Sequence, residues 1–462
     1  MPVTKSKNLV HDTKGKKAYI VAVDMGYGHQ RAVYPLRHLA APFSNDCGSR
    51  DYVINANQYN GIPKHDRKKW EDSQKLYELI SRFKSVPLIG NSIFDAMDYF
   101  QRIESFYPKR DQSSPTIQLK SIYGSIKRGW GKHLIQTLNQ KPLPLITSFF
   151  IPAYFAEEHN YKGDIYLMCC DADVSRAWAP LHSVTSRIHY LVPNRRVKER
   201  LMQYGVKEGN IFITGFPLPK ENIGGSSLKI LKRSLAQRIH HLDPEHRYRR
   251  KYKHLLEQLS ITLPSGCDEY CPVTITFAVG GAGAQRDVGI TLLQSLHHEI
   301  DAGRIKLNLV AGSRRDVYED YARAVERLHV KRKHRGNISV LYAERKVDYF
   351  EAFNEVLLET DILWTKPSEL SFYAGLGLPI IMAPTIGSQE EFNKSWLLSI
   401  GAAFAQEDPQ YAHEWLFDWL RSGWLAEAAM KGFLDAPRNG TYHVEDVVLR
   451  GKKSEIEDLH LL

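Results

Sequence analysis

His29 is the residue whose surroundings most suggest chemistry. It ends the turn DMGYGH (24–29), which follows the apolar, β-branched run AYIVAVD (18–24) and precedes a helical pattern. His29 is therefore expected at the start of a helix. There the positive end of the helix disfavours imidazolium and leaves the ring able to accept a proton. Because the chain holds 19 histidines, a surface or capping role is the competing interpretation.

A glycine-rich loop in the second half has the features of a phosphate-binding turn. VGGAGAQRD (279–287) follows a strand-like run and precedes a helical pattern. Glycines there let backbone N–H groups approach a diphosphate, and the helix N-terminus adds favourable potential. The loop lacks the GK[ST] of a Walker A motif and the full GxGxxG spacing. A tight structural turn is therefore the alternative.

Two polar clusters follow consecutive strand-like runs. TKPSE (365–369) ends the run DILWTK (361–366), and QEEFN (389–393) comes after LPIIMAP (378–384). Open α/β sheets bind ligands at the carboxyl ends of their strands. Lys366 and Ser368 are suited to phosphate, whereas Gln389, Glu390 and Asn393 are suited to hydroxyl groups. Any one of them could instead be a helix cap or a surface residue.

These motifs need a scaffold of strands alternating with helices. Further strand-like runs are found at 164–170, 188–193, 211–215, 304–312 and 337–342. Helical stretches such as 195–205 and 316–329 separate them, which predicts βαβ units and parallel sheets. We expect an α/β fold with two Rossmann-like, doubly wound domains. The expected division is an N-terminal domain (1–220), a basic helical linker or insertion (221–268) and a C-terminal domain with C-terminal helices (269–462).

Composition and charge narrow the class of protein. The 462 residues are 43% hydrophobic and 25% charged, which excludes a disordered, collagenous or coiled-coil chain. Five cysteines are too few for a disulfide framework, and their spacing predicts no zinc site. The N-terminus has no apolar signal region, and no apolar run nears the ~20 residues of a membrane span. A cytoplasmic protein is expected.

The net charge of +10 is unevenly distributed. Residues 1–220 hold 32 Lys and Arg against 19 Asp and Glu, whereas residues 257–462 hold 21 against 30. The two halves are therefore expected to meet different partners. Nucleic acid is not expected to be one of them, because no DNA-binding motif is present; steep salt dependence of DNA or RNA binding would reveal such a partner.

Three stretches resemble GT-B-fold glycosyltransferases. The group most similar contains plant monogalactosyldiacylglycerol synthase and the bacterial enzyme that adds N-acetylglucosamine to the lipid-linked peptidoglycan precursor. The stretches are DMGYGHQRA (24–32), CCDADVSRAW (169–178) with 190–218, and FAVGGAGAQRD (277–287) with 363–393. The resemblance implies two domains facing across a cleft. It also implies inverting transfer of a hexosyl unit from a UDP-sugar to a hydroxyl of a lipid or other acceptor.

The resemblance also implies roles for individual residues. His29 would be the catalytic base, and neither a metal nor a resident cofactor is expected. The donor would contact Gly280, Gly281, Gly283, Gln285, Arg286, Gly312, Arg314, Lys366, Ser368, Glu369, Gln389, Glu390 and Asn393. The acceptor would contact Gly26, Tyr27, Gly28, Asp171 and Trp178.

Two positions depart from the family pattern. Phe372 stands where relatives carry the glutamate that holds the donor ribose, and Glu369, one turn earlier, is the candidate substitute. Tyr27 stands where relatives often carry another glycine. These departures leave two alternatives open. One is a catalytically inactive nucleotide- or glycan-binding protein, and the other is a UDP-sugar epimerase of the same fold.

A segment of the front half has the composition of a membrane-surface helix. In residues 118–140, Lys120, Lys127, Arg128 and Lys132 alternate with the apolar side chains Ile122, Tyr123, Ile126, Trp130, Leu134 and Ile135. Basic residues beside tryptophan and aliphatic residues suit an interface with anionic lipid. We therefore expect a peripheral membrane contact or an anionic lipid-linked acceptor. The alternative is that these aromatic residues pack in the N-terminal core. Residues 41–145 match no family motif, and the oligomeric state is not predicted.

Overall fold

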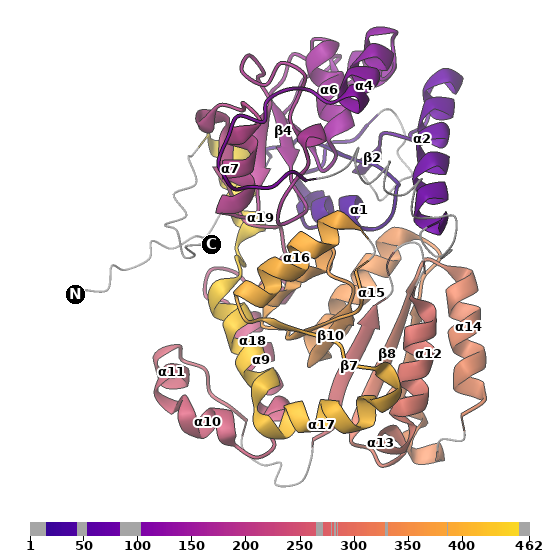
Figure 1. Ribbon diagram of the computed structural model, residues 1–462, viewed down its shortest axis with the longest axis vertical. Coiled ribbons are helices and arrows are strands. Elements are labelled where there is room, and N and C mark those ends of the chain that lie inside the picture. The colour runs from indigo at the N-terminus through magenta and orange to yellow at the C-terminus, as the bar shows by residue number, and fades with distance from the viewer. Residues whose placement is uncertain are drawn as a thin grey trace.

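The computed structural model describes residues 15–43, 53–83, 103–264, 271–278, 280, 283, 285–328, 331–385 and 387–451. Within them, the chain forms two layered bodies, one above the other in Figure 1. Each body contains one parallel six-stranded sheet flanked by helices.

The N-terminal sheet has the strand order β2-β1-β3-β4-β5-β6, and every neighbouring pair is parallel. Its strands are short and mostly buried, as expected of a sheet covered on both faces. They are β1 (Tyr19–Ala22), β2 (Val53–Asn55), β3 (Leu145–Thr147), β4 (Ile165–Met168), β5 (His189–Val192) and β6 (Ile211–Ile213). The helices of this half are α1 (Gly28–Val33), α2 (Lys64–Phe83), α4 (Ile117–Lys127), α5 (Lys132–Leu138), α6 (Phe150–Glu158) and α7 (Arg195–Gln203).

The C-terminal sheet has the order β12-β11-β10-β7-β8-β9, again with parallel neighbours. Counted within this half, the order from one edge is third, second, first, fourth, fifth, sixth, which is that of a dinucleotide-binding Rossmann sheet. Its strands are β7 (Val273–Ala278), β8 (Ile305–Gly312), β9 (Ile338–Tyr342), β10 (Ile362–Thr365), β11 (Ile380–Met382) and β12 (Ala403–Ala405). The expected fold class of two doubly wound α/β domains is therefore confirmed.

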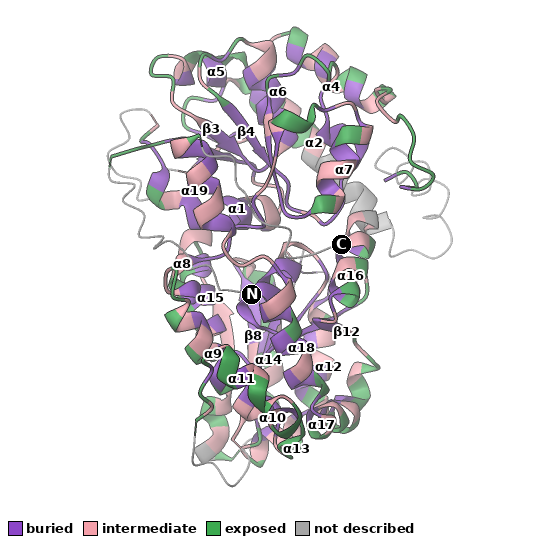
Figure 2. Cartoon of the chain, turned by 90° about the vertical axis from the view of Figure 1, so that its left-hand side faces the viewer, coloured by how far each residue is buried: buried purple, intermediate pink, exposed green. Residues whose placement is uncertain are grey.

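Helices of the second half cover both faces of this sheet (Figure 1). Figure 2 colours the residues of these helices and strands by burial, with the buried ones in purple. The helices include α12 (Arg286–Ser295), α13 (His297–Asp301), α14 (Arg315–Glu326), α15 (Lys346–Glu359), the 3-10 helix η5 (Glu369–Leu376), α16 (Ser388–Ser399), α17 (Ala412–Ser422) and α18 (Trp424–Asp435). Three helices come between β6 and β7 in the sequence. α9 (Lys229–Leu242) packs on α18, while α10 (Arg247–Lys251) and α11 (Lys253–Gln258) project to one side (Figure 1).

The last described helix, α19 (Gly440–Arg450), returns to the N-terminal half. The Thr441 hydroxyl donates to the Leu218 carbonyl at 2.5 Å, and Gly440 lies against the Phe216 carbonyl, which a Cβ there would approach to 2.1 Å. Helix α19 therefore packs against the segment that follows β6.

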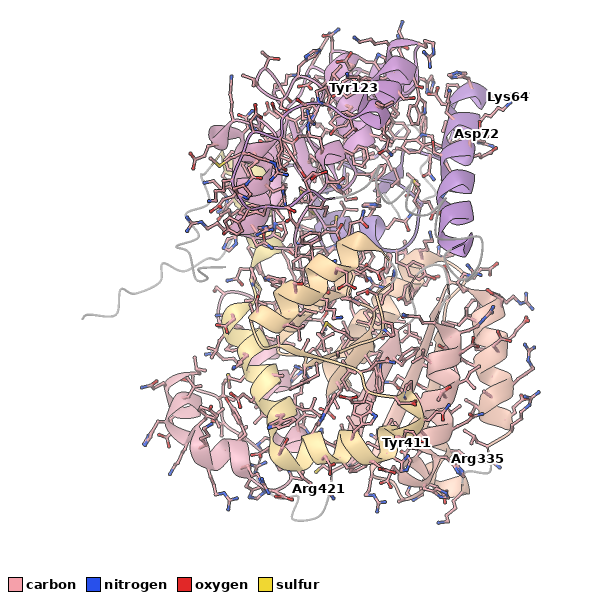
Figure 3. All side chains as sticks on the ribbon, viewed as in Figure 1. Lys64, Asp72, Tyr123, Arg335, Tyr411 and Arg421 are labelled. Atoms are coloured by element: carbon pink, nitrogen blue, oxygen red, sulfur yellow. The ribbon has the colours of Figure 1, made fainter. Side chains whose placement is uncertain are left out.

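The segment 118–140 forms α4 and α5, but its apolar side chains face inward. Tyr123, Ile126, Trp130 and Leu134 are all buried in the N-terminal core, and Tyr123, labelled in Figure 3, packs on Tyr154 at 5.1 Å between ring centroids. The alternative interpretation, that these aromatic residues pack in the N-terminal core, is therefore confirmed, while the membrane contact stays a prediction. Lys127, Arg128 and Lys132 remain exposed. No helix within the described ranges is both long and apolar enough to span a bilayer.

Candidate functional site

His29 is held by the loop that follows β3. Its Nδ1 lies 2.9 Å from the Ser148 carbonyl oxygen, and the Ser148 hydroxyl donates to the His29 carbonyl at 2.6 Å. The rings of Phe149 and Trp178 flank the imidazole, with centroids 4.7 and 6.4 Å away. Since a carbonyl oxygen only accepts hydrogen bonds, Nδ1 carries the proton and Nε2 carries the lone pair.

Burial lowers the pKa of His29 to about 4, and the Ser148 carbonyl and the Glu369 carboxylate oppose that shift. The ring is therefore neutral at pH 7. A neutral imidazole with a fixed tautomer and an unprotonated Nε2 has the properties required of a general base.

The two aspartates of the DAD sequence have different partners. Asp173 is buried and ion-paired with Arg196 and Arg200, each at 2.9 Å, so it stabilises the fold. Asp171 comes after β4, and its Oδ1 accepts a hydrogen bond from Asn393 at 3.0 Å. Burial raises the pKa of Asp171 to about 6, with Glu369 and Glu390 adding to the rise while Asn393 and Lys366 oppose it.

Asn393 joins the two halves of the chain. It lies on α16 and is fully buried. Its Oδ1 accepts from the Ala172 N–H at 2.7 Å, while its Nδ2 donates to Asp171 and to the Pro367 carbonyl at 3.3 Å. Asn393, expected to bind the donor, and Asp171, expected to bind the acceptor, are therefore hydrogen-bonded to each other.

The glycine loop after β7 lies against the residue that follows β10. A Cβ on Gly280 would stand 2.6 Å from Cε of Lys366, so only glycine lets the lysine pass there. The Lys366 ammonium forms an ion pair with Glu390 on α16. Gly283 has a φ of +67°, and its N–H donates to the Gly280 carbonyl at 2.8 Å. Gly281 lies outside the described residues.

Tyr27 reaches from the N-terminal turn to the end of β8. Its hydroxyl accepts from the Ser313 N–H at 2.7 Å and lies 3.1 Å from the Ser313 Oγ. A Cβ on Gly312 would come within 2.4 Å of that hydroxyl. Tyr27 is therefore a contact between domains. Its neighbours Gly26, with a φ of +114°, and Gly28 belong to the same turn.

Several expected donor residues have partners elsewhere in the C-terminal half. Arg286 pairs with Asp320 at 2.8 Å, and Arg314 pairs with Asp316 at 2.9 Å. Gln285 donates to the Pro384 carbonyl at 2.8 Å. Ser368 precedes η5 and Gln389 lies in the first turn of α16, and no side-chain hydrogen bond caps either helix.

Phe372, which the resemblance places at the ribose-binding position of the glycosyltransferases, is part of the core. Its ring stacks on Phe216 with centroids 4.8 Å apart and lies 4.9 Å from Trp396. It is 1% exposed. Phe372 therefore packs on the segment that follows β6.

Three polar residues of this region were not predicted from the sequence. Asp24 forms an ion pair with Lys346 on α15, Ser148 holds His29, and Arg31 is buried with its Nε 3.3 Å from Glu369. Arg31 belongs to the DMGYGHQRA stretch, but its partners lie more than 300 residues away. No local pattern could have identified them. Within the described ranges, no three His, Cys, Asp or Glu side chains are grouped to hold a metal ion.

Comparisons with known proteins match different parts of the chain. The family described as Domain of unknown function (DUF6938) matches residues 267–413, and no curated protein matches. Among solved structures, the chain is similar to MurG of Acinetobacter baumannii, with 12% identity, coverage of 94% of this chain and 99% of that chain, and a TM-score of 0.46. It is also similar to a UDP-GlcNAc 2-epimerase of Neisseria meningitidis bound to UDP-GlcNAc, with 11% identity, coverage of 73% and 83%, and a TM-score of 0.42.

A third similar structure is the glycotransferase of kitacinnamycin, with 12% identity, coverage of 73% of this chain and 84% of that chain, and a TM-score of 0.41. The two parallel six-stranded sheets by themselves give two Rossmann-like domains.

Proposed function

We propose that the protein is a glycosyltransferase that moves a hexosyl unit from a nucleotide sugar, UDP-linked, to an acceptor hydroxyl with inversion. Residues 1–220 would bind the acceptor, residues 269–462 the donor, and 221–268 would link them. The observation that carries the proposal is the placement of His29. Its Nδ1 is committed to the Ser148 carbonyl at 2.9 Å, beside residues that follow strands of both sheets.

A direct displacement needs one base for the incoming hydroxyl. Nε2 of His29 would take the proton as the acceptor oxygen forms its bond to the anomeric carbon. The bond from that carbon to the phosphate oxygen would break, and its electron pair would leave with the nucleotide diphosphate. No second protein nucleophile is required for inversion.

The departing diphosphate needs positive potential. Lys366 would supply it from the end of β10, next to the turn at Gly280 and Gly283, where a diphosphate can approach the backbone. The Lys366–Glu390 pair would then rearrange, with the ammonium turning to the phosphates. Asn393 and Gln389 lie on the same helix, α16, and are suited to sugar hydroxyl groups.

A thermal-shift panel of nucleotides and nucleotide sugars tests the donor class. A ligand that binds only the native state at 100 times its Kd stabilises by about 2.7 kcal/mol. We expect UDP and UDP-sugars to raise Tm more than the matching GDP and ADP compounds. Equal or absent shifts across the panel would contradict a UDP-sugar donor. Retained nucleotide binding with no sugar transfer would favour the catalytically inactive alternative.

A group of carboxyl residues at this site favours a second candidate, a UDP-sugar epimerase. Burial raises the pKa of Asp171 to about 6, and Glu369 and Glu390 add to the rise. A displacement does not use a carboxyl that is half protonated near pH 6. An epimerase needs such groups to move protons on the sugar. Incubation with UDP-sugar alone separates the candidates, because an epimerase would change the sugar and a transferase would leave it until an acceptor is added.

The acceptor side would bind an anionic lipid or membrane surface through charge. Lys127, Arg128 and Lys132 are exposed, and α2 places Lys64 and Arg67 nearby: Asp66 accepts from the Gly131 N–H at 3.1 Å. Each such cation contributes about 1 kcal/mol near an anionic leaflet. Co-sedimentation with anionic and neutral vesicles tests this role by comparing the wild type with the triple variant Lys127→Glu, Arg128→Glu and Lys132→Glu. A matched reversal of Arg250, Lys251 and Lys253, exposed on the α10–α11 segment, is the control.

A further inference from the structure

Glu369 is contributed by the C-terminal domain but faces the N-terminal one. It opens η5, directly after the Lys366-Pro367-Ser368 segment. A Cβ on Gly28 would lie 3.2 Å from its Oε2, so the carboxylate rests on the first residue of α1. The glycine at position 28 leaves room for this approach.

Arg31 fixes the carboxylate in that position. Its Nε lies 3.3 Å from Glu369 Oε1, and its Nη2 donates to the Tyr349 hydroxyl at 2.6 Å. The guanidinium is 2% exposed and lies 4.5 Å from the ring centroid of Phe353 and 4.9 Å from that of Phe350. A buried guanidinium held by a hydroxyl, two rings and a carboxylate has little freedom to move.

The groups around His29 come from several elements. Glu369, on η5, raises the pKa of His29 against the effect of burial. The Cys170 thiol, which follows β4, contacts at 3.7 Å the same Ser148 carbonyl that holds His29. The negative charge of Glu369 acts on Cys170, Asp171 and His29, which all belong to the N-terminal half.

We infer that Glu369 is a positioning residue for the acceptor side, held by Arg31 so that its charge stabilises His29 as that ring takes the acceptor proton. This inference rests on the proposed transferase function. It gives Glu369 a different role from the ribose contact expected from the sequence. The site is then complete only when the C-terminal domain is seated on α1.

The chemical reason is the charge that develops during transfer. When the acceptor O–H bond breaks and its proton moves to Nε2, the neutral ring becomes an imidazolium. Nδ1 is already committed to an uncharged carbonyl, so no carboxylate on that side balances the new charge. A preorganised carboxylate in a buried site lowers the cost of forming it.

The test compares Glu369→Gln and Glu369→Asp with the wild type. The control is Glu355→Gln, which removes an exposed carboxylate on α15. With donor and acceptor both saturating, we expect Glu369→Gln to lower kcat roughly 10–100-fold, up to the lower end of the 10²–10³-fold range of direct electrostatic contributions. Glu369→Asp should recover part of that loss. The Kd for UDP should stay within about twofold, because the carboxylate is engaged by Arg31. A tenfold weaker UDP affinity with nearly normal kcat would overturn the inference and restore the ribose role.

A second measurement does not depend on turnover. NMR titration of isotope-labelled histidine follows His29 directly, with its signal identified by its absence in His29→Gln. Since the Glu369 charge raises the pKa of His29, Glu369→Gln should move the titration to lower pH, and the Glu355 control should not. An unchanged midpoint would overturn the inference even in an active enzyme. A shifted midpoint in a protein that transfers no sugar would instead count against the proposed function alone.

Discussion

The two strand–turn–helix units of the site, β1–α1 and β7–α12, use the same local design for different purposes. In the first, Asp24, Tyr27 and Arg31 all contact the C-terminal domain, at Lys346, Ser313 and Tyr349. In the second, the side chains at the start of α12 bind within their own domain. Arg286 pairs with α14, and Gln285 donates to the Pro384 carbonyl.

This difference predicts different effects of mutations in the two turns. The described glycines of the loop after β7, Gly280 and Gly283, lie against Lys366 and Val317 of their own domain. Nucleotide binding should therefore tolerate changes in the N-terminal turn. The geometry around His29 depends on both domains, because α1 is held from the other side of the interface. Chemistry should therefore be lost by changes in either half, whereas donor affinity should be lost only by changes in the second.

Replacing His29 with alanine should produce the largest effect. Loss of a general base typically costs 10²–10⁴-fold in rate. We expect kcat to fall by roughly that factor while the Kd for UDP stays nearly unchanged, since the proposed base would act on the acceptor hydroxyl and not on the diphosphate. Steady-state kinetics with calorimetry on the same preparation measure both quantities. Turnover close to wild type would remove His29 from the mechanism.

The complementary change is Gly280→Val, which should weaken donor binding without removing the base. Even a Cβ at this position would stand 2.6 Å from Lys366 Cε, and a branched side chain would also keep a diphosphate away from the backbone. We expect UDP affinity to fall roughly 10–100-fold, equivalent to about 1.4–2.8 kcal/mol. Gly336→Val, at an open position on the same half, is the control. Equal affinities in both variants would show that the loop is only a turn.

The sequence predicted most of the scaffold because buried parallel strands are continuous apolar runs. The runs 164–170, 188–193 and 304–312 became β4, β5 and β8. The strands that were missed, β2, β3 and β12, have three residues each. β6 and β11 are equally short, but they lie inside the longer apolar runs 211–215 and 378–384, which made them predictable. The segment 118–140 was correctly expected to contain helix. An apolar helical face can bury against a core or a membrane, however, so its environment was not predictable from periodicity.

The site was predictable as a list of motifs but not as a set of contacts. Glycine turns and polar clusters at strand ends identified His29, Lys366 and Asn393, because parallel sheets place ligands at that edge. The Asn393–Asp171 hydrogen bond and the Arg31–Glu369 pair join residues separated by 222 and 338 positions, respectively. Such pairs depend on how two domains meet, and spacing along one chain carries no information about that.

A smaller effect is expected from Tyr27→Phe, which tests the interdomain role of the first turn. The variant keeps the ring, whose centroid lies 5.0 Å from that of Tyr349, but removes the hydroxyl that accepts from the Ser313 N–H. Leaving that amide without its partner should cost about 1–2 kcal/mol of stability. Tyr411→Phe, at an exposed tyrosine labelled in Figure 3, should change stability by less than about 0.5 kcal/mol. Equal denaturation midpoints for the two variants would mean that the contact does not hold the domains together.

The smallest effect should come from the pH dependence of Asp171→Asn. Asp171 has its pKa raised to about 6 in the folded protein, compared with 3.8 in a model compound. A raised pKa favours the protonated fold, so this contribution to stability is complete below pH 3.8 and is lost as pH rises through 6. Asparagine stays neutral and can still accept the hydrogen bond from Asn393. As pH rises from 5 to 8, the free energy of unfolding of the variant should therefore increase by about 1 kcal/mol relative to that of the wild type. Urea denaturation at both pH values measures this gain, with Glu351→Gln on the exposed side of α15 as the control. If the variant instead loses stability relative to the wild type over this pH range, the Asp171 carboxylate is stabilised as an anion at the interface. Asp171, Glu369 and Glu390 would then not share a site.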